Sequence, residues 1–406
     1  MTDETQPKKE LVRFEKEGNV GLITLNRPEK RNAMNLALWK VLDKAVTAAA
    51  EDPEVRAVAV PIPIRLVRPV ALDIDGPGPG PGDPDGATWG LEATGALASP
   101  YTGRGVCVAV LDTGIDAAHE AFQGPGLELI QRDFTGEGEG DGDSEGHGTH
   151  VAGTVFGRSV GGRRIGVAPG VPRALIGKVL GRATITTTET LVRAIEWAID
   201  GGATVVNLSL GFDFPALVRR WTDDGMPADL TTSRALELYR DNLRLVDGLM
   251  ELIEAQARIG KGALLVAAAG NESKRDLRPD YRIAVAPPAA GDGILSVGAL
   301  GTAGPPHDRL SIAPFSNSRP LVCAPGVAVT SARAGGGLVR LSGTSMASPH
   351  VAGLAALWAE YQRRQGFPIR VGTLFSKLEG QAGCGRLAPY ADAGDIGAGL
   401  VTAPRD

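Results

Sequence analysis

Residues 106–116 read Val106-Cys-Val-Ala-Val-Leu-Asp112-Thr-Gly-Ile-Asp116, and they define the architecture expected of this chain. The first six residues form a continuous apolar run rich in valine, which is typical of a strand buried on both faces of a parallel sheet. The run ends at Asp112, so the pattern predicts a carboxylate at the carboxyl end of a central strand. In open α/β sheets, this is the edge where binding and chemistry take place.

Strands and helices are expected to alternate along the rest of the chain. Further apolar runs predict strands at residues 203–208, 264–268, 294–297 and 321–323, with helices at 190–200 and 233–258. This alternation indicates an α/β fold, a doubly wound and mostly parallel sheet flanked by helices. The second helix carries an apolar stripe at helical spacing, from Leu236 to Ile253, which is expected to pack on the core.

The composition argues against several classes of protein. The chain has 406 residues, and 42 Lys and Arg against 47 Asp and Glu give a formal net charge of −5. Mild acidity without a basic tract argues against a nucleic-acid partner. No apolar run reaches the roughly 18 residues of a membrane span, and no secretory signal is visible. We therefore expect a cytoplasmic monomer, or a secreted protein if the natural start lies elsewhere.

Composition changes abruptly after residue 75. Gly76-Pro-Gly-Pro-Gly-Pro-Gly-Asp-Pro-Asp85 is predicted to hold neither a helix nor a sheet ladder, so residues 61–86 are interpreted as a linker. It separates a larger domain, residues 87–406, from a small ββαβ segment, residues 1–60. The strands of that segment are expected at residues 11–15, 20–25 and 55–60, and its helix at 35–50.

Three short blocks carry reactive side chains at the ends of predicted strands and helices. Asp112 follows a strand, His147 opens a helix in Gly146-His147-Gly-Thr-His150, and Ser345 opens another in Ser342-Gly-Thr-Ser345-Met-Ala-Ser-Pro349. A serine hydroxyl is a good nucleophile when an imidazole accepts its proton, and a carboxylate fixes the tautomer of that imidazole. Taken singly, the three residues are equally consistent with a turn cap, a surface histidine and a helix N-cap.

A fourth block, Val266-Ala-Ala-Ala-Gly270-Asn271-Glu, places an amide just past another predicted strand. The NH₂ group of Asn271 can donate to a developing oxyanion, together with the free N–H groups at the start of the Ser345 helix. The alternative role of Asn271 is that of a turn residue.

Asp112, His147, Asn271 and Ser345, in this order and with their small neighbours, resemble the subtilisin-like serine proteases (subtilases, peptidase family S8). The resemblance covers about residues 87–404. It implies a subtilisin-like fold and a serine endopeptidase that cleaves polypeptides through an acyl-enzyme. Asp112 would orient His147, His147 would act as the base, Ser345 as the nucleophile and Asn271 as an oxyanion donor.

The same resemblance implies two substrate-binding segments. One pairs with the extended substrate backbone, and the other forms a wall of the pocket for the residue before the cleaved bond. They are Ser209, Leu210 and Gly211, and Ala268, Ala269 and Gly270. No cofactor is required under this interpretation.

The loop Gly136-Glu-Gly-Glu-Gly-Asp-Gly-Asp-Ser-Glu145 is rich in carboxylates and precedes His147. Structural Ca²⁺ is one expectation for it, although the order of residues is not that of an EF-hand. Selection of basic substrates and a raised His147 pKa are the alternatives. The three cysteines provide no disulfide framework and no metal pattern. Cys107 is expected to be a small buried residue and His150 a structural one.

Residues 11–60 carry a second resemblance. Gly21-Leu-Ile-Thr-Leu-Asn26-Arg-Pro-Glu-Lys-Arg-Asn32-Ala-Met-Asn35, followed by Asp52-Pro-Glu-Val-Arg-Ala-Val58, is similar to the start of the enoyl-CoA hydratase/isomerase (crotonase) family. The chemistry of that family comes later in its sequence, where this chain reads Pro61-Ile-Pro-Ile. A fused remnant, a substitute pro-segment and a gene-boundary artefact all stay open. The corresponding alternative functions are a latent protease controlled by its N-terminal segment and an acyl-CoA-binding protein acting through residues 1–75.

Overall fold

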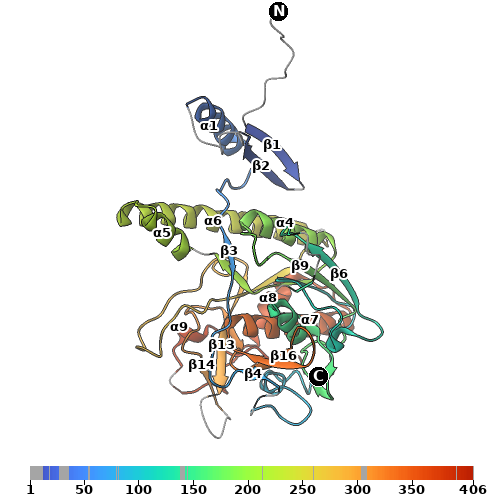
Figure 1. Cartoon of the computed structure of the whole chain (residues 1–406). Coiled ribbons are helices and arrows are strands. Elements are labelled where there is room, and N and C mark those ends of the chain that lie inside the picture. The colour runs from blue at the N-terminus through green and yellow to red at the C-terminus, as the bar shows by residue number, and fades with distance from the viewer. Residues whose placement is uncertain are drawn as a thin grey trace, which may run out of the picture.

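The computed structural model describes residues 12–405 except residues 18, 27–35, 54, 79, 81, 138–141, 144, 213, 259, 303–308 and 390. A central sheet with helices on both faces forms the main body, and a hairpin with one helix stands at one end (Figure 1). The strands are β1 (Val12–Glu17), β2 (Val20–Leu25), β3 (Ile64–Leu66), β4 (Gly76–Pro77), β5 (Cys107–Asp112), β6 (Glu128–Asp133), β7 (Ser159–Val160), β8 (Arg163–Arg164), β9 (Arg173–Lys178), β10 (Val205–Leu208), β11 (Leu210–Phe212), β12 (Leu264–Ala268), β13 (Leu295–Thr302), β14 (Leu310–Ile312), β15 (Val322–Pro325), β16 (Val329–Ala332) and β17 (Leu338–Leu341). The helices are α1 (Leu36–Glu51), α2 (Trp89–Ala93), α3 (His147–Phe156), α4 (Thr188–Asp200), α5 (Phe214–Asp223), α6 (Ala228–Ala257), α7 (Thr344–Arg364), α8 (Val371–Gly380) and α9 (Ala393–Ile396), with a 3₁₀ turn η2 (Glu120–Phe122).

The central sheet has the order β14-β13-β12-β10-β5-β9-β6, and β15 pairs with β13. All of these pairs are parallel except β13 with β14. The predicted α/β architecture with a mostly parallel sheet is therefore confirmed. Asp112 ends β5, near the middle of this sheet, as the apolar run before it predicts.

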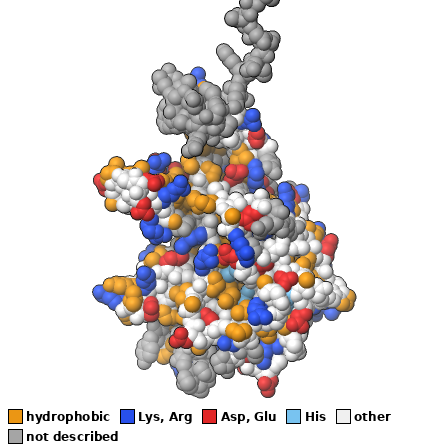
Figure 2. Space-filling model, in the orientation of Figure 1, with side chains coloured by type: hydrophobic (Ala, Val, Ile, Leu, Met, Phe, Trp, Pro, Cys, Tyr) orange, Lys and Arg blue, Asp and Glu red, His pale blue; other side chains and the backbone are white. Residues whose placement is uncertain are grey.

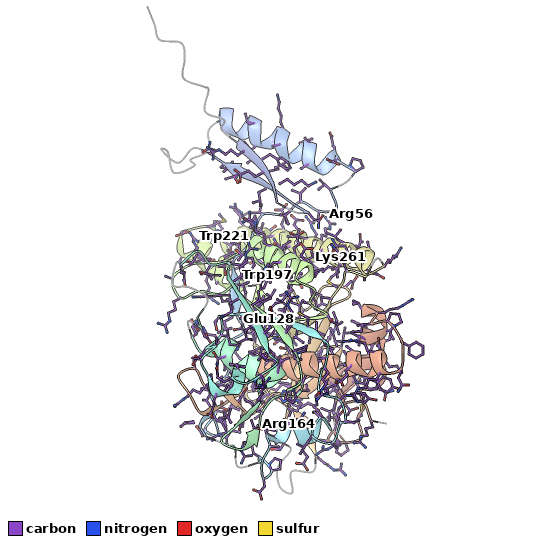
Figure 3. All side chains as sticks on the ribbon, turned by 90° about the vertical axis from the view of Figure 1, so that its right-hand side faces the viewer. Arg56, Glu128, Arg164, Trp197, Trp221 and Lys261 are labelled. Atoms are coloured by element: carbon purple, nitrogen blue, oxygen red, sulfur yellow. The ribbon has the colours of Figure 1, made fainter. Side chains whose placement is uncertain are left out.

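Both faces of β5 are covered, which explains why its apolar run is continuous. Val108 and Val110 belong to the core beneath α3, α7 and α8, whereas Ala109 and Leu111 belong to the core beneath α4 and α6. Figure 1 shows α4 and α6 above the sheet and α7 and α8 below it. Figure 3 shows Trp197 within the upper helix layer and Glu128 at the level of the sheet.

The N-terminal hairpin and helix agree with prediction, and the third strand does not. β1 pairs antiparallel with β2, and α1 follows. Residues 55–60 form no strand; Val60 is 63% exposed and pairs with no other strand among the described residues. Extended pairing begins four residues later, at Ile64, because only there do aliphatic side chains meet a buried partner strand. Residues 27–35, part of the crotonase-like stretch, lie outside the described residues.

Residues 61–86 are not the free linker that their composition predicts. β3 pairs with β11, and β4 pairs with β17 at the edge of a small sheet. An edge strand tolerates proline, since the missing N–H can face away from the ladder. Asp83 fixes the end of this segment, because its carboxylate accepts hydrogen bonds from the backbone of Gly80 and Trp89 and from the Thr330 hydroxyl.

The apolar stripe of α6 is buried only along its second half. Val246 and Ile253 lie in the core, but Leu236 is 63% exposed, so the first turns of the helix project beyond the sheet (Figure 1). There α5 packs against it, with the rings of Phe214 and Tyr239 tilted by 57° and 4.8 Å apart between their centres. Within the described residues, no helix combines the length and apolar character that crossing a bilayer requires.

Candidate active site

Asp112 and His147 form a buried pair between the end of β5 and the start of α3. His147 Nδ1 lies 2.8 Å from Asp112 Oδ1, and both side chains are almost fully buried. With the carboxylate accepting the Nδ1 hydrogen, the neutral ring carries its lone pair at Nε2. That Nε2 atom is buried and has no hydrogen-bond partner among the described residues. A buried imidazole with an open acceptor and an anionic neighbour is what general-base catalysis requires.

Asp143, which the sequence analysis did not single out, joins the two elements that carry this pair. Its carboxylate accepts hydrogen bonds from the Thr113 hydroxyl at 2.7 Å and from the backbone N–H groups of Gly146 and Thr149, each at 2.8 Å. The Thr113 oxygen in turn accepts the N–H of Gly148 at 2.9 Å. An acidic residue four positions before a helix start, with small residues between, was the available signal for such a cap.

Ser345 lies in the first turn of α7, which packs against α3, and its side chain is fully buried. Its hydroxyl donates to the backbone carbonyl of Val67 at 2.9 Å. The hydrogen bond to His147 Nε2 that the resemblance implies is therefore not the one that this hydroxyl makes. Contact between Ser345 and His147 stays a prediction. The hydrogen bond of the Ser345 hydroxyl goes to another segment of the same chain, at Val67.

Asn271 is held with its NH₂ group directed at the same segment. Its Oδ1 accepts from the backbone N–H of Thr344 at 2.9 Å and from the Thr344 hydroxyl at 2.8 Å. Nδ2 donates to the backbone carbonyl of Arg68 at 2.9 Å. Because Thr344 occupies the acceptor side, the amide presents a donor next to Ser345, as oxyanion stabilisation requires. Thr344 is a second residue that the sequence analysis missed, since its role depends on two elements far apart in the chain.

The segment over Ser345 is residues 62–68, hereafter the covering segment. Its strand β3 lies antiparallel to β11, with Leu66 opposite Leu210 and Ile64 opposite Phe212. On its other side the backbone N–H of Ile64 donates to the carbonyl of Thr186 at 2.9 Å. The covering segment thus pairs as a strand with β11 on one side and bonds to the residues just before α4 on the other.

Residues 209–211 pair with extended backbone, as the resemblance implies. The Ser209 carbonyl accepts the N–H of Val67 at 3.3 Å, and Gly211 lies opposite Arg65. The backbone bound here belongs to the chain's own covering segment. Ala268 ends β12, and Ala269 and Gly270 follow it; Ala269 bonds through its backbone to Val297 and Ala286. The role of these three residues as a pocket wall stays a prediction.

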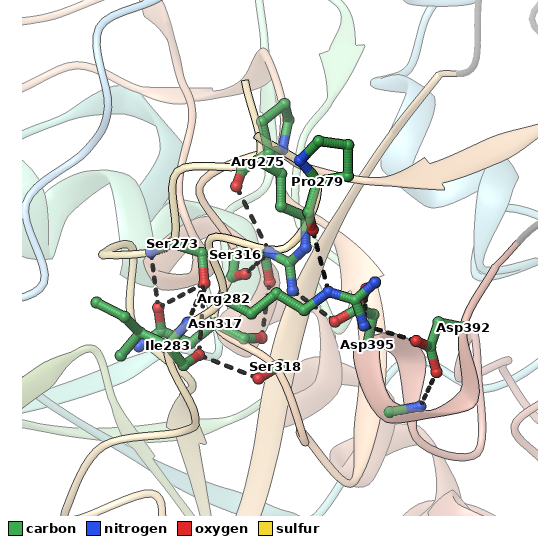
Figure 4. Close-up of polar contacts among 12 residues, drawn as sticks. Ser273, Arg275, Pro279, Arg282, Ile283, Ser316, Asn317, Ser318, Asp392 and Asp395 are labelled. Atoms are coloured by element: carbon green, nitrogen blue, oxygen red, sulfur yellow. Dashed lines mark hydrogen bonds and ion pairs between the residues drawn. The ribbon is translucent and has the colours of Figure 1, made fainter. Parts of the chain in front are cut away.

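Asn317 anchors the loop that carries Asn271. Its Oδ1 accepts the N–H groups of Glu272 and Ser273, and its Nδ2 donates to the carbonyl of Ala269 at 3.1 Å. Figure 4 shows the surrounding contacts, in which Ser273 joins Ile283 to Asn317. Further along the loop, two arginines form ion pairs at the start of α9. Arg275 pairs with Asp395, and Arg282 pairs with Asp392.

We expect Thr344→Val to lower kcat by about tenfold to a hundredfold. Valine keeps the shape of Thr344 but cannot donate to Asn271 Oδ1, so the amide loses one of the two bonds that fix its orientation. Loss of one oxyanion donor costs about 10²–10³ in kcat in subtilisin, which sets the upper limit. Steady-state kinetics with a peptide substrate measure the effect. Thr344→Ser, which keeps the hydroxyl, is the control, and equal activity of the two variants would contradict the role.

The remaining described histidines are structural. His150 Nε2 bonds to the carbonyl of Val329 at 2.9 Å, and His350 Nδ1 bonds to that of Met346 at 2.8 Å. Burial lowers the pKa of His150 to about 3 and the pKa of His350 to about 4. His119 caps η2 by accepting the N–H of Ala121. The expected structural role of His150 agrees with its position.

These two buried histidines predict acid sensitivity. Their folded pKa values lie below the ordinary value of about 6.5, so the unfolded chain binds more protons between those limits. Stability is therefore fully present above pH 6.5 and is lost as the pH falls towards 4 and then 3. Each pKa unit is worth about 1.4 kcal/mol, so the free energy of unfolding should fall by several kcal/mol. Urea titrations at a series of pH values measure it; His350→Gln should flatten the slope, and an unchanged slope would contradict the assignment.

The described carboxylates of the acidic loop are engaged by protein groups. Glu137 accepts the backbone N–H groups of Thr184 and Ala183, which lower its pKa, and it pairs with buried Lys178 at 3.8 Å. No metal-binding cluster of His, Cys, Asp or Glu occurs among the described residues, although residues 138–141 and 144 of this loop lie outside them. All three cysteines are free thiols; Cys107 is half-buried rather than fully buried.

This arrangement of fold and site defines a class of protein. Residues 103–369 match the family model described as "Subtilase family", and the chain belongs to that family. The match does not extend to residues 11–60, so the crotonase resemblance stays a prediction.

Three relatives illustrate the similarity. The chain is 35% identical over 269 residues to the "Thermophilic serine proteinase" of Bacillus sp. (strain AK1), covering 65% of this chain and 54% of that protein. It is 33% identical over 269 residues to "Subtilisin DY" of Bacillus licheniformis, covering 66% and 81%. It is 34% identical over 267 residues to the "Intracellular serine protease" of Paenibacillus polymyxa, covering 64% and 69%. Against the first of these relatives, the chain thus spans about half of the length.

Proposed function

We propose that this protein is a serine endopeptidase. Ser345 Oγ attacks the carbonyl carbon of the peptide bond while His147 Nε2 accepts its proton, and the oxyanion is held by Asn271 Nδ2 and the N–H of Ser345. The C–N bond then breaks and His147 returns the proton to the leaving amine. Water attacks the acyl-enzyme ester, with His147 again as base, and the second product leaves as a carboxylic acid. Asp112 keeps the histidine in the reactive tautomer.

One observation carries the proposal most directly. The His147–Asp112 pair is buried and leaves Nε2 unoccupied, while Asn271 is oriented by Thr344 as a donor beside Ser345. Buried His150 and His350 also leave one nitrogen without a partner among the described residues, but their other nitrogen bonds to a backbone carbonyl, whereas that of His147 bonds to the carboxylate of Asp112. A carboxylate in this position stabilises the imidazolium that forms when Nε2 accepts a proton. The names of the relatives support the same activity.

A fluorophosphonate probe tests the activity, because it forms an adduct with an activated serine. We expect one adduct on Ser345, found by intact mass and peptide mapping, and none in Ser345→Ala. Ser348→Ala, which removes a neighbouring hydroxyl in the same helix, is the control and should keep the adduct. Absence of the adduct both in the full chain and in an Ile64→Asp chain with a weakened covering segment would overturn the proposal.

We further propose that the protease is latent, because its own covering segment occupies the substrate site. Val67 lies where the attacked residue of a substrate would lie, since its N–H reaches Ser209 and its carbonyl accepts from Ser345. Yet the Asn271 donor bonds to the carbonyl of Arg68, one residue further on, rather than to that of Val67. The carbonyl next to the nucleophile therefore lacks this oxyanion contact. Such a register favours inhibition over cleavage.

The partner under this proposal is a polypeptide substrate, and the protein acts as a monomer with no nucleic-acid partner and no required cofactor. A formal net charge of −5 supports the absence of nucleic acid. A cytoplasmic location is supported by the three free thiols, because reducing compartments keep cysteines unpaired.

A further inference from the structure

The covering segment presents two arginines to two carboxylates of the protease domain. Counting from Val67, the residue facing Ser345, Arg65 lies two positions before it and Arg68 directly after it. In the standard nomenclature of protease subsites these are positions P3 and P1′, with the equivalent of the cleaved bond between Val67 and Arg68. Arg65 pairs with Glu272, and Arg68 pairs with Glu145.

The Glu272 carboxylate is held in position by hydrogen bonds to Asn317, with one oxygen left to bind a cation. Its Oε2 accepts the NH₂ group of Asn317 at 2.7 Å, and its backbone N–H donates to Asn317 Oδ1 at 3.0 Å. The second oxygen, Oε1, receives the Arg65 guanidinium at 2.6 Å. The Glu272 side chain is 28% exposed and follows Asn271 directly. A carboxylate held in this way loses little side-chain entropy when a cation binds, which favours the pair.

Glu145 lies on the other side of the cleaved bond, two residues before His147. It pairs with Arg68 at 3.2 Å, but the Arg68 side chain is 73% exposed, so water screens this pair more strongly. Glu272 is therefore expected to be the stronger determinant and Glu145 the weaker one.

A general negative surface does not account for these contacts. Figure 2 shows Lys and Arg side chains in a band across the middle of the face on which β3 is seen in Figure 1. Long-range attraction would therefore not draw cations to this part of the molecule. The preference has to come from carboxylates placed at single positions along the bound backbone.

We propose that Glu272 makes this protease select substrates with Arg or Lys at P3. The inference rests on the proposed endopeptidase activity. The buried Ile64 and Leu66 indicate the aliphatic residues that suit P4 and P2 in a probe peptide. Matched probes are thus Ile-X-Leu-Val-Ala peptides in which X is Arg, Gln or Glu.

The test compares kcat/KM for the three peptides in the full-length chain, because a ratio within one enzyme cancels the occupancy of its covering segment. We expect kcat/KM for the Arg peptide to be about three- to fivefold higher than for the Gln peptide, which is the effect of a partly exposed ion pair. The difference between the Arg and Glu peptides should be larger, because the Glu side chain is repelled by Glu272. Glu272→Gln should bring the Arg/Gln ratio close to one, and 1 M salt should shrink it in the wild type. Glu128→Gln, on β6 (Figure 3), is the charge-matched control and should keep the ratio.

A binding arm separates this inference from the activity on which it rests. Dye-labelled forms of the same peptides are titrated into Ser345→Ala, with and without Glu272→Gln. If the Arg peptide binds more tightly only when Glu272 is present, but the wild type cleaves none of the peptides, the proposed activity is overturned and the specificity is not. Cleavage with an Arg/Gln ratio that Glu272→Gln leaves unchanged would overturn the specificity alone. Equal binding of the Arg, Gln and Glu peptides would also overturn the specificity.

Discussion

Asp112→Asn is expected to lower kcat by about 10⁴ while the chain stays folded. The amide would present an NH₂ group or an uncharged oxygen to His147 Nδ1, whereas the carboxylate now accepts a hydrogen there at 2.8 Å. The ring would favour the tautomer with its hydrogen on Nε2, and that nitrogen could no longer accept a proton from Ser345. The imidazolium formed during the reaction would also lose its buried counter-charge. Kinetics with a fluorogenic peptide and far-UV circular dichroism measure activity and fold together.

The matched control for this change is Asp116→Asn. Asp116 lies four residues further along the same strand-to-loop passage, and its carboxylate accepts backbone N–H groups of Ala118 and Gly335 rather than a histidine. The control should retain activity within a fewfold range. If Asp112→Asn were as active as Asp116→Asn, the role of Asp112 would be wrong.

Weakening the covering segment is expected to raise kcat/KM by about a hundredfold. Ile62, Ile64 and Leu66 are at most 9% exposed, so their replacement by Asp would bury charges without partners. A tethered inhibitor acts at an effective concentration of order millimolar, so its release from a site with micromolar affinity changes occupancy by two or more orders of magnitude. A peptidase assay on the triple variant measures the gain.

Val60→Asp is the control for that experiment. Val60 precedes the covering segment by two residues and is 63% exposed, so a charge there is solvated. It should leave the activity at the wild-type level. A triple variant that folds normally and yet is no more active than Val60→Asp would show that the covering segment does not limit the enzyme.

The sequence predicts the parts of this molecule that are set by local pattern. The valine-rich run of β5 and its terminal Asp112 are both where the pattern places them, because a strand buried on two faces has a distinctive composition. His147 and Ser345 likewise open helices as predicted. The residues that hold these groups in place were harder to predict, because Thr344 acts through Asn271 and Asp143 joins the helix of His147 to Thr113, and both contacts link residues far apart in the chain.

The segment between residues 61 and 86 shows where local pattern fails. Its prolines and glycines exclude a helix and disfavour an independent sheet, but they do not exclude an extended strand that borrows hydrogen bonds from a neighbour. Ile64 and Leu66 carried the useful signal, an alternation of aliphatic residues between prolines. Residues 55–60 show the opposite error: an apolar run with no partner strand remains irregular and exposed.

The covering segment is attached to the body on both sides, and the two attachments differ in kind. Downstream, β4 and the Asp83 contacts join the chain to β17 and to the start of α2. Upstream, the chain is attached by isolated hydrogen bonds, such as the one from the Asn242 side chain to the carbonyl of Val60 and the one from the backbone N–H of Asn19 to the Glu196 carboxylate. A single cut between Val67 and Arg68 would therefore leave two fragments. The fragment that begins at Arg68 would stay fixed by the β4 pairing and the Asp83 contacts, whereas the fragment that ends at Val67 would be retained only by its own affinity. Inhibition would then fade on dilution, as it never can while the chain is continuous.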